Sequence, residues 1–244
     1  MELKWLIPLC LLLSGCAREQ MDDCFTGTGP TRREERTVAP FHAVDVADRI
    51  DVVLEDRADG TVTVEAGRSL LPQVETVVEH GVLTVRNDNR CNWVRSYRPR
   101  ITVFLPIRSV ERLVLRGSGD VHAKDTIRSA RFAVEQWGGE GTVSLCLDVQ
   151  YLSCALHSGV GDAILQGRCS AVADLYSGVL GAIDASALRT AVVNVNNSGV
   201  ADIRCWAEAE LAVQVLSRGD VYYRGAPATI QQDIRGSGSV FRMD

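Results

Sequence analysis

The sequence is short of the features that mark several large classes of protein. Only 7 of its 244 residues are proline and only 6% are aromatic, beside 21 glycines, so the composition matches neither collagen nor a proline-rich linker. Its net charge is −5, whereas nucleic-acid-binding domains carry an excess of Lys and Arg. Hydrophobic residues make up 46% of the chain, enough to build a sizeable core. We therefore expect a folded acidic protein that does not bind nucleic acid.

Motifs for metal binding, cofactor binding and catalysis are also missing. The eight cysteines include no Cys-x-x-Cys pair and the four histidines are scattered, so neither a zinc site nor any other metal site is expected. The sequence has no Gly-x-Ser-x-Gly motif of the hydrolase type. Its Gly-x-Gly turns precede predicted strands, whereas a phosphate-binding turn opens a helix. The sequence predicts no catalytic residue, no cofactor and no enzyme.

The N-terminal apolar run is too short to cross a membrane. It covers residues 5–13, against about 20 residues for a transmembrane helix, and Leu-Ser-Gly-Cys follows at 13–16. This is the pattern of a bacterial lipoprotein signal, in which an acylated Cys16 becomes the new N-terminus. We predict a signal peptide over 1–15, a flexible tether over 16–37 and lipid anchoring in the cell envelope, at the outer membrane. An ordinary signal peptide with an accidental cysteine is the alternative.

Export exposes the remaining cysteines to an oxidising compartment. Cys24 and Cys91 lie in polar, loop-like contexts, so we predict a disulfide between them that joins the tether to the fold. Cys146 and Cys169 lie off the apolar ladders described below. Whether these two bridge neighbouring coils is left open.

Residues 38–110 mostly alternate apolar and polar side chains, as at Val62 to Val64 and Leu83 to Val85. A period of two with many β-branched residues predicts half-buried strands. These strands form either a separate small β-domain or the first coils of the repeat that follows.

From residue 111 to 244 the chain repeats every 20 residues or so. The second glycine of Gly-x-Gly recurs at intervals of 22, 20, 20, 20, 18 and 19, and Ala201 is the one substitution. These positions are 119, 141, 161, 181, 201, 219 and 238. Apolar ladders at spacing two stand on both sides of the glycines, and Cys154 and Cys205 fall on inward positions of them. The period predicts an all-β fold, a right-handed parallel β-helix or solenoid, with these two cysteines in its core.

Two further predictions concern the corners. We attribute the glycines to a tight turn with positive φ, and Asp120, Asp162 and Asp220 to local Asx-type turns. A calcium site is the alternative for the aspartates, but the row is broken by residues without carboxylates. One extra residue at Asn196 or Asn197 predicts a β-bulge.

The repeat carries a resemblance to a known family. Gly-Ser-Gly-Asp-Val at 117–121, Ser-Gly-Val-Gly-Asp at 158–162 and a terminal Gly-Ser-Gly-Ser, all behind a lipoprotein signal, resemble the family "putative auto-transporter adhesin, head GIN domain". The resemblance covers roughly residues 39–244 and departs from the usual pattern at the corners 137–140 and 197–200. It implies an all-β fold of exported proteins common in Bacteroidetes envelopes, and it transfers no catalytic residue.

The first functional hypothesis is a non-catalytic, adhesin-like envelope lipoprotein whose solenoid surface binds a glycan, a surface polymer or an envelope protein. Aromatic side chains on a flat sheet suit sugar stacking or a protein partner. The candidate binding residues are Trp206, Tyr222, Tyr176 and Arg224.

Two alternatives come from other classes. Parallel β-helices also host polysaccharide lyases and hydrolases, and Asp184 and Arg204 are the one carboxylate and cation expected side by side on an outward row. We expect an ordinary surface ion pair there. The second alternative is a structural protein that self-associates through an apolar last coil near Val240 and Phe241.

Overall fold

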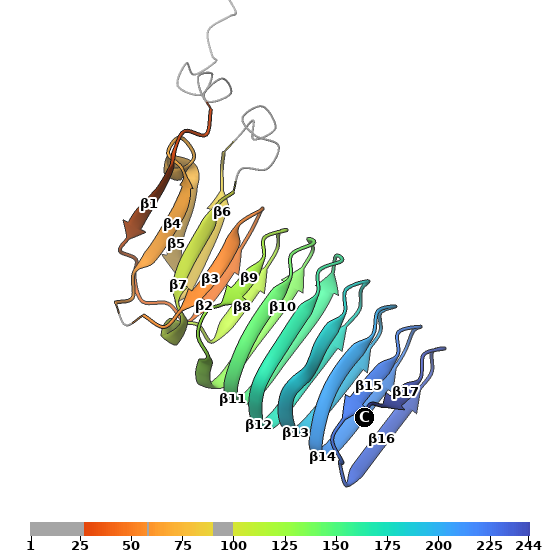
Figure 1. The fold of residues 1–244 in the computed structure, drawn as a ribbon. Helices are drawn as coiled ribbons and strands as arrows, with labels where there is room; N and C mark the ends of the chain where they lie inside the picture. The colour runs from red at the N-terminus through yellow and green to blue at the C-terminus, as the bar shows by residue number, and fades with distance from the viewer. Residues whose placement is uncertain (1–26, 58, 90–99) are drawn as a thin grey trace, which may run out of the picture.

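The computed structural model describes residues 27–57, 59–89 and 100–244, and these form one continuous stack of strands (Figure 1). Among them the only helices are two short 3-10 turns, η3 (Leu71–Gln73) and η4 (Ile107–Ser109). The strands are β1 (Thr31–Arg36), β2 (Ala43–Val46), β3 (Asp51–Glu55), β4 (Val62–Gly67), β5 (Val74–Glu79), β6 (Val82–Asn87), β7 (Thr102–Pro106), β8 (Arg112–Leu115), β9 (Val121–Ala123), β10 (Ile127–Trp137), β11 (Val143–Ser158), β12 (Ala163–Ser177), β13 (Ile183–Asn197), β14 (Ile203–Val215), β15 (Val221–Arg224), β16 (Thr229–Ile234) and β17 (Val240–Arg242). The predicted all-β solenoid is confirmed. The predicted signal peptide, Cys16 and the Cys24–Cys91 disulfide lie outside the described residues.

Each coil crosses two faces of the solenoid. The long strands β11 to β14 bend near their middle and pair in parallel with the next coil on both sides of the bend. Face A consists of β9, β15, β17 and the first halves of β11 to β14. Face B consists of β8, β16, the second half of β10 and the second halves of β11 to β14. The Gly-x-Gly corners join face B of one coil to face A of the next, and we call the edge that they form the corner edge (Figure 1).

The N-terminal strands belong to the same stack. β2 pairs in parallel with β8, and β3 with β9, so residues 43–55 form the coil beneath the repeat. Buried apolar residues from Phe41 to Val221 form one cluster. The core therefore runs without a break from the N-terminal strands into the Gly-x-Gly coils.

The predicted flexible tether over 16–37 is wrong for residues 31–36, which form strand β1. This strand pairs antiparallel with β4, and Thr31 lies opposite Gly67. Two of its arginines find partners on neighbouring segments: Arg33 pairs with Glu65, and Arg36 Nη2 donates to Leu71 O at 2.8 Å. Mixed charges that look like a solvated linker in the sequence instead cover the edge of the sheet.

The predicted inward ladders are confirmed. The first runs from coil to coil through fully buried side chains at the start of each face A strand. Its members are Val121, Val143, Ala163, Ile183, Ile203 and Val221. Cys154 and Cys205 are likewise buried free thiols in the core, as predicted.

A bridge between Cys146 and Cys169, left open by the sequence, is wrong, because both are free. In the parallel register Cys146 lies opposite Gln166, and Cys169 lies opposite Val149. Three residues along the strand therefore separate the two thiols, and Cys169 Sγ instead donates to Gln150 O at 3.3 Å.

The buried thiols make stability fall at alkaline pH. Burial raises the pKa of Cys154 and of Cys205 to about 12, whereas an unfolded cysteine has a pKa of about 8.5. Above that unfolded value the unfolded chain loses these protons and the folded chain keeps them, so raising the pH favours unfolding. We expect a loss of up to about 1.4 kcal/mol for each thiol per pH unit, measured by urea unfolding at pH 8 and pH 10.

A Cys154→Ala/Cys205→Ala variant is the control for this prediction. It is less stable at pH 8 because it leaves two small cavities, but it should lose less stability between pH 8 and pH 10 than the wild type. An equal alkaline loss in both proteins would contradict the assignment to these thiols.

The corner glycines are needed for close packing of coils more than for positive φ. Among the described corners, Gly139 and Gly159 have φ of +86° and +104°, but Gly141 and Gly181 do not have positive φ. A Cβ at Gly141 or Gly181 would lie 2.0 or 1.9 Å from the carbonyl oxygen of the glycine one coil below. The prediction that positive φ explains the row is therefore wrong for the second glycines. Ala201 shows that one corner accommodates a methyl group.

The corner aspartates bond between coils, so the prediction of local Asx-type turns is wrong. Asp120 Oδ1 accepts from Thr142 N, and Asp162 Oδ1 accepts from Ala182 N, each at 2.8 Å. Asp220 Oδ1 accepts from Ser239 N at 2.8 Å in the last coil. Coils stack about 4.8 Å apart, so a short carboxylate reaches the backbone N–H of the next corner. In the described ranges, no group of three His, Cys, Asp or Glu is placed to hold a metal ion.

Buried polar side chains hold the same corners from inside. Gln136 Nε2 donates to Gly141 O at 3.0 Å, and Ser177 Oγ donates to Gly181 O at 3.2 Å. Asn197 takes the equivalent place in the next coil and is fully buried. The bulge predicted at Asn196 or Asn197 is wrong, because the register runs through both residues and breaks earlier in β13.

Candidate ligand-binding groove

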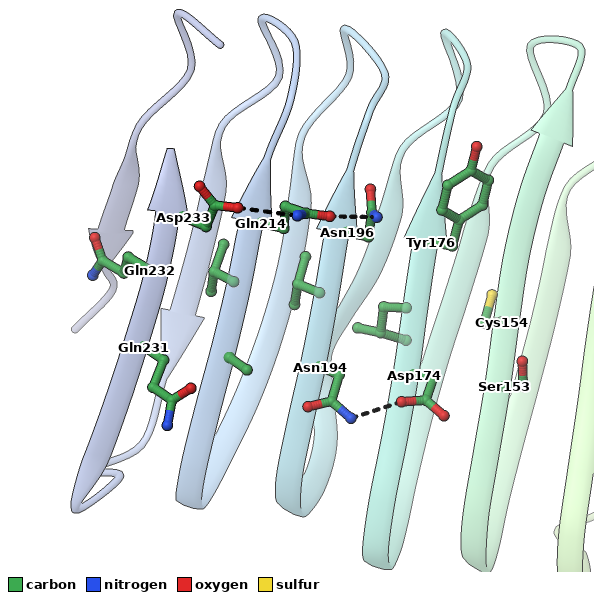
Figure 2. Close-up of a pocket in the computed structure, with 14 residues that line it drawn as sticks. Ser153, Cys154, Asp174, Tyr176, Asn194, Asn196, Gln214, Gln231, Gln232 and Asp233 are labelled. Carbon is green, nitrogen blue, oxygen red and sulfur yellow. Dashed lines mark hydrogen bonds between the residues drawn. The ribbon is translucent and has the colours of Figure 1, made fainter. Parts of the chain in front are cut away.

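A row of polar side chains crosses face B near the corner edge. Tyr176 on β12, Asn196 on β13, Gln214 on β14 and Asp233 on β16 are register neighbours. Their side chains project outward, because successive side chains of a strand alternate between its two faces. The residues directly before Asn196 and Gln214, which are Val195 and Val213, point into the core. Figure 2 shows the row along neighbouring strands.

Hydrogen bonds join Asn196, Gln214 and Asp233 of this row. Asn196 Nδ2 donates to Gln214 Oε1 at 2.9 Å, and Gln214 Nε2 donates to Asp233 Oδ2 at 3.1 Å (Figure 2). Ser198 Oγ donates to Asn196 Oδ1 at 2.7 Å from the corner itself. Side chains that are already ordered lose little conformational entropy when a ligand binds.

A second polar row lies two residues earlier in the same strands. It consists of Ser153, Asp174, Asn194 and, beyond Ala212, Gln231. Asn194 Nδ2 donates to Asp174 Oδ1 at 2.8 Å (Figure 2). Residues of both rows line an open hollow of about 460 Å³, which we call the amide groove.

The groove offers hydrogen-bond donors and acceptors and one aromatic ring. The hydrogen bond from Arg235, and then that from Gln214, hold the pKa of Asp233 below its ordinary value, so this carboxylate stays charged and accepts. Asp174 and Asp233 lie three strands apart, about 14 Å at 4.8 Å per strand. Paired carboxylates of glycosidases are about 5 to 9.5 Å apart. The groove is thus arranged for binding polar groups, not for glycoside hydrolysis by this pair.

Aromatic side chains extend the groove toward the N-terminal coils. The rings of Trp137 and His157 stack with centroids 3.9 Å apart, and His157 lies 5.3 Å from Tyr176. Trp137 Nε1 donates to Glu135 at 3.2 Å. These rings give face B an aromatic margin next to the polar rows.

The four residues that the sequence proposes as a binding surface do not form one site. Tyr176 lines the amide groove, but Trp206 and Arg224 lie opposite each other on face A. They line a separate hollow of about 720 Å³ beside the C-terminal residues. The proposed set is corrected, because outward side chains before the bend lie on face A and outward side chains after the bend lie on face B.

The face A rings are also covered. The Arg189 guanidinium lies 4.7 Å from the Trp206 ring, and Tyr222 lies between Arg204 at 5.5 Å and Phe241 at 5.3 Å. A ring whose face already carries a guanidinium or another ring is less available to stack on a ligand. Face A is therefore the weaker candidate.

The comparison with protein families decides the relationship. The profile described as "putative auto-transporter adhesin, head GIN domain" matches residues 40–227. The chain belongs to this family. The match begins after β1 and spans the N-terminal strands from β2 onward, as well as most of the Gly-x-Gly coils of the head GIN domain.

Solved structures share the fold of this head GIN domain. A putative adhesin from Bacteroides fragilis has a TM-score of 0.78 and 24% identity, covering 88% of this chain and 97% of its own. A putative adhesin from Parabacteroides distasonis has a TM-score of 0.68 and 20% identity, covering 89% and 98%. A protein of the same organism, described as a putative lipid binding protein, has a TM-score of 0.60 and 22% identity, covering 89% and 98%. A search of curated proteins found no match.

Asp184 and Arg204 are register neighbours on face A of the head GIN domain, as predicted, but they are not bonded as a pair. Arg204 lies 3.7 Å from Asp202, and Asp184 Oδ1 accepts from Ser186 Oγ at 2.6 Å. The expected ion pair between them is therefore wrong, because each has a nearer partner on its own chain segment. In the described ranges, no helix is long and apolar enough to span a bilayer.

Sequence reasoning missed most of the amide groove in this head GIN domain. The row at 176, 196, 214 and 233 has intervals of 20, 18 and 19, close to those of the corner glycines. Placing every coil in register and reading its outward polar positions would have found the row. A search for exposed aromatic residues finds Tyr176 but no other residue that lines the groove.

Proposed function

We propose that the protein is a non-catalytic, adhesin-like envelope protein that binds a glycan chain in the amide groove. The observation that carries the proposal is the ordered row of Tyr176, Asn196, Gln214 and Asp233. Sugar hydroxyls donate and accept hydrogen bonds. The amides of Asn196 and Gln214 can do both, and the carboxylate of Asp233 accepts. The Tyr176 ring supplies an apolar surface for a sugar face.

An extended ligand fits the groove better than a single sugar. The row crosses four strands, about 14 Å at 4.8 Å per strand, and the residues that line the groove come from successive coils (Figure 2). Such a shape suits a segment of a surface polysaccharide. Family membership supports the same setting, because the family and two of the structural neighbours are described as adhesins.

We propose that the protein is anchored to the outer membrane by acyl chains on Cys16. The support is the Leu-Ser-Gly-Cys sequence at 13–16 after a short apolar run. Dual or triple acylation gives stable anchoring, whereas one chain is marginal.

Binding to glycans tests the proposal. On a glycan array and in titrations with extracted envelope polysaccharide, we expect saturable binding that Tyr176→Ala and Asn196→Ala each weaken about tenfold. Tenfold corresponds to about 1.4 kcal/mol, the scale of one lost hydrogen bond or ring contact.

Trp206→Ala is the matched control, because it removes from face A an aromatic side chain that is partly exposed, as Tyr176 is. It should leave binding unchanged. Binding lost in Trp206→Ala but kept in both groove variants would overturn the proposal, and so would an empty array together with no binding to polysaccharide.

Self-association is a second candidate, favoured by the open end of the solenoid. In the last coil Ile230, Ile234 and Phe241 are 39%, 45% and 46% exposed, and β16 and β17 have a free edge that another strand can pair with. We expect sedimentation velocity to show a larger species as concentration rises, and Ile234→Lys to abolish it. A single concentration-independent monomer would exclude this candidate.

A further inference from the structure

Apolar side chains line the corner edge on consecutive coils. Val160, Leu180 and Val200 are the middle residues of three successive corners and are 47%, 63% and 36% exposed. Leu216 follows at the next corner and is 40% exposed. None of the four belongs to the buried core. We call these four residues the apolar ridge.

The backbone beneath the ridge is fixed. Val160 N donates to Gly139 O at 3.0 Å, and Val200 N donates to Val179 O at 3.1 Å. The glycines on either side leave no room for the corners to sink into the coil below, as the Cβ distances at Gly181 show. The four side chains therefore stay outside, where each keeps its apolar surface in water unless another surface covers it.

The charges around the ridge do not oppose an apolar contact. Asp162 and Asp202, which stand beside it, bond to backbone N–H groups of the next corner, Ala182 N at 2.8 Å and Asp220 N at 3.1 Å. Their carboxylates are thus directed along the stack. The exposed charges at the two ends of the ridge, Glu140 and Arg218, have opposite signs.

The described chain begins at the same edge. β3 and β7 start at the corner edge, β4 runs antiparallel to β7, and β1 runs antiparallel to β4. Thr31 therefore lies at the corner edge, beside Gly67 (Figure 1). Thr31 lies fifteen positions after Cys16, which gives a reach of up to about 50 Å for an extended chain.

The distance along the edge is shorter than that reach. From β1 to β15, the face A strand after the last corner of the ridge, the stack has nine steps, about 43 Å at 4.8 Å each. An anchor at Cys16 can therefore sit under any corner of the ridge.

We propose that the corner edge docks on the lipid bilayer, with Val160, Leu180, Val200 and Leu216 inserted at the level of the headgroups. The proposal rests on the lipid anchor of the proposed function. In this orientation the solenoid lies along the membrane, face B stands upright, and the amide groove opens sideways to solvent. The anchor and the ridge together would hold the groove at a fixed height above the lipid.

The test uses the full acylated chain reconstituted in phosphatidylethanolamine and phosphatidylglycerol vesicles. A genetically encoded fluorescent amino acid at position 180 reports the ridge, and the same probe at position 150 reports the opposite edge, where β11 bends. We expect lipid-borne quenchers to act on position 180 and aqueous iodide quenching there to be lost. At position 150 the reverse is expected.

A second variant guards against an effect of the probe. Val160→Asp/Val200→Asp, with the probe at 180, should restore iodide quenching while the protein stays on the vesicles through its acyl chains. These substitutions are on exposed side chains, so the fold should survive them.

The outcomes separate the anchor from the docking. A mature N-terminus without acyl groups in mass spectrometry overturns the anchor and the docking with it. An acylated protein whose position 180 is open to iodide overturns only the docking. Shielding of position 180 from both quenchers means that a protein surface covers the ridge, which also overturns membrane docking.

Discussion

Gly139→Ala is expected to destabilise the solenoid by about 3–5 kcal/mol. A Cβ at this position would lie 2.0 Å from Gly117 O of the coil below, and the residue has φ of +86°. The methyl group would have to separate two backbone segments that have little freedom to move, and the backbone would also be strained. Urea or thermal unfolding followed by far-UV circular dichroism measures the loss.

Gly138→Ala is the matched control, one residue away. Gly138 has φ of +102°, but nothing lies within 4 Å of its Cβ position. Only the strain remains, so we expect a loss of about 1–2 kcal/mol. If both variants lost the same stability, positive φ and not close stacking would explain the corner, and the account of the glycine row would be contradicted.

Asn197→Ala is expected to cost about 2–3 kcal/mol, because it leaves buried backbone groups without partners. Asn197 is fully buried, and its Nδ2 donates to Ala201 O at 3.0 Å and Asp220 O at 3.2 Å. Its Oδ1 accepts from Gly199 N at 3.2 Å. One side chain thus holds two successive corners, and equilibrium unfolding in urea measures what it contributes.

Asn197→Ser tests the same position more gently. Ser177 occupies the equivalent place one coil earlier and donates to Gly181 O, so serine should recover part of the bonding and cost about 1 kcal/mol. A loss below about 0.5 kcal/mol in Asn197→Ala would mean that water replaces the side chain at no cost, contrary to this account.

The repeat made the fold predictable from the sequence. With a period near 20 residues, equivalent residues of successive coils stack on one another. The inward ladder through Val143, Ala163 and Ile183 therefore follows from the spacing alone, and so does the burial of Cys154. What spacing does not contain is the contact between coils. The carboxylate of Asp120 satisfies a donor in the next coil, and Gly181 is small because of a carbonyl one coil below. A local turn explains neither the aspartate nor the glycine, because each contacts the neighbouring coil.

The candidate site was less predictable because it depends on the bend within each strand. Tyr176 and Trp206 both occupy outward positions, but Tyr176 follows the bend in its strand and Trp206 precedes the bend in its own, so they face opposite ways. Likewise residues 31–36 look like a linker in the sequence, since the partner of Arg33, Glu65, is 32 residues away in the chain. Pairing between segments outside the repeat leaves no periodic signal.

The central claim is that the amide groove on face B holds the ligand, and carboxyl footprinting tests it most directly. Carbodiimide labelling of the protein with and without extracted envelope polysaccharide should show protection of Asp174 and Asp233, which line the groove. Asp184 on face A should be labelled equally in both samples. Protection of Asp184 with Asp174 and Asp233 unprotected would contradict the claim.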